Sequence, residues 1–313
     1  MQPVRSFVVG ANARCGSTLL CRALADTGVA GRPEEYFITG PAEAFPPGWK
    51  FWEEGPLALE HGVSDRRAYL ELVFRLGTTG NGVFGVKMMW NYVPWALEKL
   101  RELPEYRELS QAEAFAALLP GLRLVQLVRR DRIRQAVSWL RAAQEGVWVV
   151  SDTEPATPSG EPRYDFAVIA GMERLIIEGE EGWGRFAGEL GLARHVVTYE
   201  DLVAPDRYPD VLSGVLEFLE VDGAGTAPPA PRTWRQADGL NEEWAERFER
   251  ERAARIALGS KDPGEQCPPG ARVRLGEDGL EVILHRVLGQ EHQPRDVTGR
   301  RASDDMIKQL CLT

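Results

Sequence analysis

A cation, a thiol, a glycine and two hydroxyls stand together near the N-terminus, in the stretch Arg14-Cys15-Gly16-Ser17-Thr18. An apolar, β-branched run precedes it at Phe7-Val8-Val9, and an apolar segment of helical period continues to Leu24. A loop between a strand and a helix N-terminus directs backbone N–H groups and the positive end of the helix dipole at one point. The stretch therefore predicts a phosphate site, while a Gly-Ser turn that caps a buried helix fits these residues equally well.

This loop differs from a nucleotide-binding P-loop, in which Lys follows the second glycine. Here Ser17 follows Gly16, and the cation stands earlier, at Arg14. Such a loop keeps hydroxyl and backbone donors for a phosphate but needs no bridging magnesium, so we expect no metal. Cys15 has no His or Asp close in sequence that would make it a nucleophile, and we interpret it as a small packing residue.

Further basic residues lie at the ends of two later apolar runs. Lys87 lies near the end of the run 82–91, and Arg129 and Arg130 directly follow the run 122–128. Ligands of open parallel sheets bind beyond the carboxyl ends of the strands, so Lys87 is a candidate to contact a group in transfer. Ser138, about two turns into the next helix, would converge with an arginine on a second phosphate. A surface lysine and an incidental polar serine fit these positions as well.

Two carboxylates, Glu34 and Glu35, precede the aromatic pair Tyr36-Phe37. Gly31 and Pro33 break regular structure before them, which predicts a loop or a short edge segment. A carboxylate beside apolar rings loses hydration and becomes a better base for a hydroxyl proton. From these residues alone, two solvated loop charges are the simpler interpretation.

The remaining pattern predicts an α/β fold, a P-loop-like parallel β-sheet flanked by helices with a short C-terminal extension. A further strand with a polar exit is expected over 195–202, and residues 41–62 are expected to be irregular. Asp131 is expected to cap the helix that follows it. Other helices are expected over 65–76, 93–103, 111–119, 166–190 (interrupted near Gly179 and Gly182), 211–219 and the solvent-exposed 242–255. We expect one domain over 1–258 and an extension of unknown role over 259–313.

Composition narrows the class of protein. The net charge of −10 over 313 residues argues against nucleic acid as a partner. No apolar run approaches the roughly 20 residues of a membrane helix, no signal peptide is evident, and the four cysteines show neither metal nor disulfide spacing. These features predict a cytoplasmic protein that does not span a membrane. Local positive charge for an anionic ligand is concentrated at Arg129, Arg130, Arg132, Arg134 and Arg141.

Several motifs together resemble sulfotransferases that use 3′-phosphoadenosine-5′-phosphosulfate (PAPS), and most closely the bacterial trehalose 2-sulfotransferase family. The resemblance covers roughly residues 4–255. It rests on the loop 14–18 and on Gly31-Arg32-Pro33-Glu34-Glu35-Tyr36-Phe37, the run 81–91, Arg129-Arg130, Gln135-Ala136-Val137-Ser138, Gly182-Trp183, 197–202, Arg235-Gln236-Ala237 and Glu243-Trp244.

The resemblance implies a role for each matching residue. Glu35 would be the general base, and Arg14 with the loop Cys15, Gly16, Ser17 and Thr18 would hold the 5′-phosphate and stabilise its developing charge. Arg129, Arg130 and Ser138 would hold the 3′-phosphate of PAPS or of its product 3′-phosphoadenosine-5′-phosphate (PAP). Arg235-Gln236 would close over it, and Tyr199 would border the adenine. Many cytosolic sulfotransferases carry a catalytic His at the position of Met89, so here the base must come from elsewhere.

The implied acceptor is a hydroxyl of a sugar, a glycolipid precursor or a natural product, and the resemblance implies a homodimer. Two other functions remain open at this stage. One is a phosphotransferase that uses Mg-ATP, for which Asp131 is the nearest carboxylate after a strand. The other is a nucleotide-binding protein without activity.

Overall fold

The computed structural model describes residues 3–37, 56–148, 161–221 and 239–258. These residues fall into two compact units. The first comprises the described residues up to 130 and from 177 to 221, and the second those from 131 to 176 and from 239 onward. Within these ranges, no helix combines the length and the apolar character needed to cross a bilayer.

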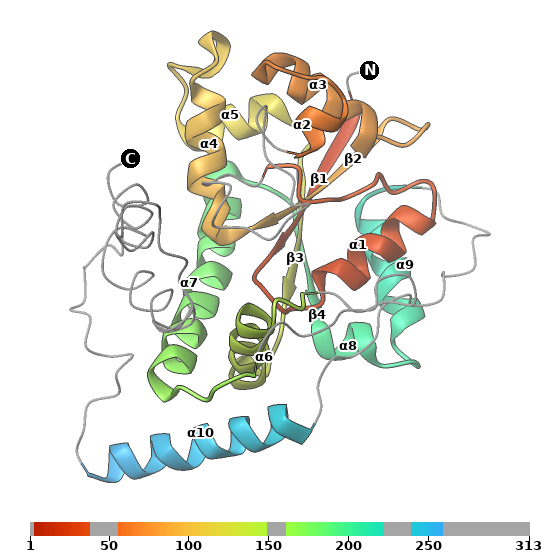
Figure 1. Ribbon diagram of the computed structural model, residues 1–313. Helices are drawn as coiled ribbons and strands as arrows, with labels where there is room; N and C mark the ends of the chain where they lie inside the picture. Colours follow the sequence, from red (N-terminus) through yellow and green to blue (C-terminus); the bar gives the residue numbers. More distant parts are fainter. Residues whose placement is uncertain (1–2, 38–55, 149–160, 222–238, 259–313) are drawn as a thin grey trace, which may run out of the picture. The chain divides into compact units, whose positions relative to one another are not determined.

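A four-stranded sheet forms the centre of the first unit (Figure 1). The strands are β1 (Arg5–Ala11), β2 (Val83–Met89), β3 (Arg123–Val128) and β4 (Arg194–Thr198), in the spatial order β2-β1-β3-β4. All three pairings are parallel, and the register sets Ala11 beside Met89 and Val128 beside Thr198. The carboxyl ends of the four strands therefore share one edge, and the predicted α/β fold with a parallel sheet is confirmed.

Helices cover both faces of this sheet (Figure 1) and pack on its alternating apolar residues. Phe7 and Val9 pack on α1 (Ser17–Asp26), α8 (Tyr199–Val203) and α9 (Tyr208–Phe218). Val8 points the other way because side chains alternate along a strand. That second face is covered by α3 (Arg66–Gly77), α4 (Val93–Arg101), α5 (Gln111–Leu118) and the second half of α7 (Phe166–Leu190).

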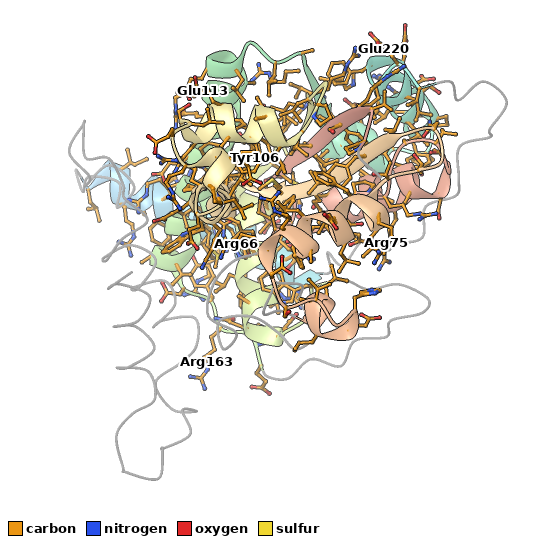
Figure 2. All side chains as sticks on the ribbon, turned by 90° about the horizontal axis from the view of Figure 1, so that it is seen from above. Arg66, Arg75, Tyr106, Glu113, Arg163 and Glu220 are labelled. Atoms are coloured by element: carbon orange, nitrogen blue, oxygen red, sulfur yellow. The ribbon has the colours of Figure 1, made fainter. Side chains whose placement is uncertain are left out.

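Local sequence signals start the helices of the second face. Asp65 accepts a hydrogen bond from Ala68 N and caps α3, and Ser110 with Glu113 forms a capping box at α5. Arg66 on α3 donates a hydrogen bond of 2.6 Å to Glu102, which directly follows α4. Figure 2 labels Arg66 on α3 and Glu113 on α5. Two short 3₁₀ turns, Trp90–Tyr92 and Pro104–Tyr106, complete the connections.

The predicted interruption of the long helix is wrong, since α7 runs without a break from Phe166 to Leu190. Its glycines allow close packing instead. A Cβ atom on Gly179 would lie 2.1 Å from Asn12 Oδ1, and one on Gly182 would lie 2.1 Å from the Trp90 ring. Tertiary packing of the helix therefore overrides the low intrinsic helix propensity of glycine.

Two further expectations need correction. The predicted strand 195–202 ends at Thr198, whose hydroxyl accepts from Asp201 N and starts the helix α8. Within the stretch 41–62, expected to be irregular, Pro56–Glu60 forms the short helix α2.

The glycine contacts give a stability prediction. Gly182→Ala is expected to lower the free energy of unfolding by about 1 to 3 kcal/mol, because the added methyl group overlaps the Trp90 ring. Gly188→Ala, in the same helix with no heavy atom within 4 Å of its Cβ position, is expected to be neutral or stabilising by up to about 1 kcal/mol. Urea denaturation measures both, and equal effects of the two changes would contradict the packing role of Gly182.

The second unit is built from α6 (Arg132–Glu145), the first part of α7 and α10 (Gly239–Ala257). Its apolar core includes Val137, Leu140, Ile169 and Phe248. Asp131 caps α6 by accepting from Arg134 N, as predicted. One side of α10 is buried through Trp244, Ala245 and Phe248, so this helix is not solvent-exposed all round as expected. The predicted extension 259–313 lies outside the described residues.

Candidate active site

The loop between β1 and α1 has the backbone that the sequence predicts. Arg14 and Gly16 have positive φ angles of 64° and 88°, and Gly16 is the N-cap residue of α1. A Cβ atom on Gly16 would lie 2.7 Å from the Tyr199 ring, so both the conformation and the close approach require glycine. The first amides of α1 have no acceptor inside the helix. The loop therefore presents donors and the positive helix end at the carboxyl edge of the sheet.

Trp183 packs against the end of the strand that leads into this loop. Its indole Nε1 donates to the Ala11 carbonyl at 3.2 Å, at the last residue of β1, and the side chain is buried. A Cβ atom on Gly10 would lie 2.8 Å from the Trp183 ring. Trp183 thus positions the end of β1, a role that the sequence motif alone did not reveal.

The two carboxylates lie on a segment that runs along the outer edge of β2. Lys87 N donates to the Glu34 carbonyl at 3.0 Å, and Glu34 forms a parallel bridge with Val86. Gly31, with φ 64°, lets the chain approach β2 closely, since its Cβ would lie 2.5 Å from Gly85 N. The predicted edge segment is therefore confirmed.

An ion pair joins this segment to the sheet. Lys87 Nζ lies 2.6 Å from Glu35 Oε1 and donates to Thr18 Oγ1 at 3.4 Å. The Lys87 and Glu35 side chains are only 9% and 16% exposed, so neither is a solvated surface charge. Burial alone would lower the pKa of Lys87, but the charge of Glu35 and its hydrogen bond outweigh burial and raise this pKa above its ordinary value. Lys87 is accordingly a protonated, buried cation.

Glu35 keeps its second oxygen apart from this pair. Oε2 is buried and makes no hydrogen bond with any residue that the structure describes. Tyr92, three residues beyond β2, has a raised pKa because of burial and, to a smaller degree, because of the charge of Glu35. Sequence reasoning did not single out Tyr92, although it follows a candidate strand end.

Arg129, which follows β3, contacts the loop between β1 and α1. It is 7% exposed, and its Nη1 donates to the Arg14 carbonyl at 3.4 Å. Its guanidinium carbon lies 4.5 Å from the centre of the Tyr199 ring, which in turn packs on Gly16. Arg14, Gly16, Arg129 and Tyr199 therefore lie together, as the sequence predicts for a site at this edge.

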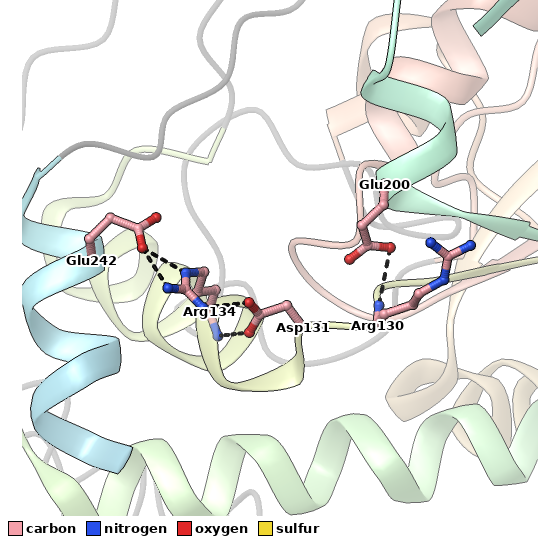
Figure 3. Close-up of polar contacts among 5 residues, drawn as sticks. All are labelled: Arg130, Asp131, Arg134, Glu200 and Glu242. Atoms are coloured by element: carbon pink, nitrogen blue, oxygen red, sulfur yellow. Dashed lines mark hydrogen bonds and ion pairs between the residues drawn. The ribbon is translucent and has the colours of Figure 1, made fainter. Parts of the chain in front are cut away.

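Two other arginines of the basic cluster, Arg130 and Arg134, make hydrogen bonds to carboxylates (Figure 3). In the first unit, Arg130 N donates to Glu200 at 3.2 Å, and Arg130 Nη2 lies 3.0 Å from Asp201 Oδ2. In the second unit, Arg134 donates to Asp131 and to Glu242, both at 2.7 Å. The local positive charge of the cluster is thus partly balanced inside each unit.

Three predicted donor residues stay predictions. Ser138 lies on α6 in the second unit, and its convergence with an arginine on one phosphate is untested. Arg235 and Gln236 lie outside the described residues.

Cys15 fits the predicted packing role. It is fully buried, and burial raises the pKa of its thiol. We expect Cys15 to react with iodoacetamide at pH 8 at least about 10²-fold more slowly in the folded protein than in urea, because burial removes both thiolate and access. Mass spectrometry of the labelled peptide measures this ratio. Rapid labelling of the folded protein would return Cys15 to the list of candidate nucleophiles.

Comparison with known proteins shows the family to which this chain belongs. The sequence profile of the Stf0 sulphotransferases matches residues 6–251. The chain belongs to the Stf0 sulphotransferase family. It is therefore a sulfotransferase, and the resemblance noted from its motifs is confirmed.

Two relatives of this Stf0 sulphotransferase are named trehalose 2-sulfotransferase. The one from Mycolicibacterium smegmatis is 29% identical over 79% of this chain and 95% of its own length. The one from Mycobacterium tuberculosis is 30% identical over 82% and 98% respectively. Among solved structures, a sulfotransferase domain of the Synechococcus PCC 7002 olefin synthase matches with 15% identity and a TM-score of 0.39, covering 79% of this chain and 88% of that one.

Proposed function

We propose that this sulfotransferase moves a sulfuryl group from PAPS to a hydroxyl of a carbohydrate or another small natural product. The observation that carries the proposal is the chain of contacts from Glu35 through Lys87 to Thr18. It joins a largely buried carboxylate, 16% exposed, to a helix N-terminus suited to a phosphate, at the edge where ligands of parallel sheets bind.

The residues of the first unit fit a donor with a 5′-phosphate. Arg14, the amides of residues 16–18 and the hydroxyls of Ser17 and Thr18 supply a cation and several donors, in a loop that Cys15 packs from inside. For the 3′-phosphate we propose Arg129 with Ser138. Burial against the loop favours Arg129, whereas Arg130 is engaged with Asp201. Arg235 and Gln236 would close over this phosphate, and Tyr199 would border the adenine.

When bound, the donor would supply the sulfuryl group, and PAP would leave through its 5′-phosphate oxygen. In the proposed reaction, Glu35 accepts the proton of the acceptor hydroxyl, which makes that oxygen a better nucleophile. Lys87 and Arg14 offer positive charge where negative charge develops on the leaving phosphate. The rigid scaffold around them would hold the acceptor oxygen and the leaving oxygen in line with the sulfur. Within this proposal no metal ion is required.

The names of the two relatives favour a sugar acceptor. We propose a sugar hydroxyl first, and a glycolipid precursor as the next class to screen. A homodimer, a cytoplasmic location, and a division into a sulfotransferase domain at 1–258 and an extension at 259–313 belong to the same proposal.

The experiment that tests the donor is calorimetric titration with PAP, in parallel with ATP and magnesium, without an acceptor. We expect tight binding of PAP without added metal and no response to ATP. Preference for magnesium-ATP would contradict the proposal and return the phosphotransferase as the better hypothesis.

The 3′-phosphate site gives a separate prediction. Arg129→Met is expected to weaken PAP binding by about 10²-fold, since it removes a charge-assisted contact, and to affect AMP much less. Ser138→Ala is expected to weaken PAP binding by about tenfold or less, with AMP again unaffected. Arg130→Met is the matched control, because it removes the same charge from the next residue. Equal losses for PAP and AMP would argue that Arg129 supports the loop and not the 3′-phosphate.

A further inference from the structure

Lys87 stands between the candidate base and the loop proposed to bind the donor. Its ammonium lies 2.6 Å from Glu35 Oε1 and donates to Thr18 Oγ1 at 3.4 Å. Thr18 lies in the first turn of α1, and Glu35 lies on the segment beside β2. One buried cation therefore contacts both the group that would take a proton and the helix end that would hold a phosphate.

In this arrangement Glu35 is not ready to accept a proton. Oε1 is paired with the ammonium, and Oε2 is buried without a hydrogen bond to any described residue. A general base must lie within hydrogen-bond reach of the hydroxyl that it deprotonates. The carboxylate must therefore be uncovered, at least in part, before an acceptor can use it.

We infer that Lys87 couples donor binding to the release of the general base. An anionic group at the N-terminus of α1 competes with Glu35 for the Lys87 ammonium, and the carboxylate is thereby freed for the acceptor hydroxyl. This inference rests on the proposed function. It predicts that the donor binds before Glu35 becomes an effective base.

Linkage makes the inference measurable without an acceptor. If donor binding weakens the pair between Lys87 and Glu35, the pair must weaken donor binding by the same factor. Removing the carboxylate charge should then tighten the binding of an anionic nucleotide, and this tightening should depend on the presence of Lys87.

The experiment is calorimetric titration of PAP into the full chain and its variants at pH 7. Glu35→Gln is expected to lower the PAP dissociation constant by about fivefold or more. Glu34→Gln is the matched control, since Glu34 is the exposed neighbour and loses the same charge; we expect a change below about twofold. In a Lys87→Met background, Glu35→Gln is expected to give no more tightening than Glu34→Gln gives in the wild-type chain.

The outcomes separate the two proposals. If the wild-type chain binds PAP but Glu35→Gln binds it no tighter than Glu34→Gln does, the coupling is refuted and the proposed function stands. Tightening that persists without Lys87 would also refute the coupling. If the wild-type chain does not bind PAP, the proposed function itself fails. Where Lys87→Met does not fold, the comparison of the two glutamine variants still refutes the inference if it shows no difference in PAP binding.

Discussion

Glu35→Gln is expected to reduce turnover by about 10²-fold or more, as the loss of a general base does. The amide has nearly the same shape and can still accept a hydrogen bond from Lys87, so the fold and the position of the segment are retained. PAP affinity is expected to be at least as high as in the wild-type chain. Single-turnover kinetics with PAPS and a sugar acceptor, together with calorimetry, measure both quantities.

The control for this prediction is Glu34→Gln. Glu34 is held through its backbone carbonyl, which accepts from Lys87 N, and its side chain is exposed. Its replacement is expected to leave turnover within about twofold of the wild-type value. Unchanged turnover in Glu35→Gln would remove Glu35 from the mechanism, and equal losses in both variants would point to the segment as a whole.

Lys87→Met is expected to have a large effect on both stability and activity. It leaves the largely buried Glu35 carboxylate without its cation, and breaking such a pair costs up to about 3 to 5 kcal/mol of unfolding free energy. Turnover is expected to fall by about 10²-fold or more, because positive charge at the reacting centre is lost. Urea denaturation and initial rates measure the two effects.

The double variant Lys87→Met/Glu35→Gln separates them. It removes both charges of the pair, so most of the lost stability is expected to return. Activity should remain low because the cation and the base are both absent. Recovery of activity along with stability would show that Lys87 acts through the fold alone.

The contribution of Lys87 to the free energy of unfolding depends on pH with a definite sign. Its pKa is raised in the folded protein, so its contribution to stability is complete below its ordinary pKa of about 10.4 and is lost only as pH rises through the folded value. Between pH 6 and 9 the lysine is protonated in both states. Titration of Lys87 is therefore expected to cause no change, over that range, in the difference in unfolding free energy between the wild-type chain and Lys87→Met.

The sequence alone determined the scaffold of this protein. Apolar runs at 7–9, 82–91 and 122–128 predicted three of the four parallel strands, because strands buried on both faces are nearly continuously apolar. The second of these strands ends at Met89, two residues earlier than predicted. Local capping chemistry predicted where helices start, as at Asp131. The motifs also identified the sulfotransferase family, which the match over residues 6–251 confirmed.

Contacts between distant segments were decided by tertiary structure. Gly179 and Gly182 looked like helix breaks, yet they allow Asn12 and Trp90 to pack on an unbroken α7. Arg129 and Arg130 are equivalent in sequence, but one is buried beside Tyr199 and the other pairs with Asp201.

The contacts of Glu35 were also decided by tertiary structure. From the sequence alone, the simplest interpretation of this residue was a solvated charge on a loop. Folding places it 2.6 Å from Lys87, which lies 52 positions later in the chain. Periodicity and capping depend on near neighbours and can be predicted from the sequence. The pairing of buried charges depends on which strands lie side by side, and only the folded chain decides that.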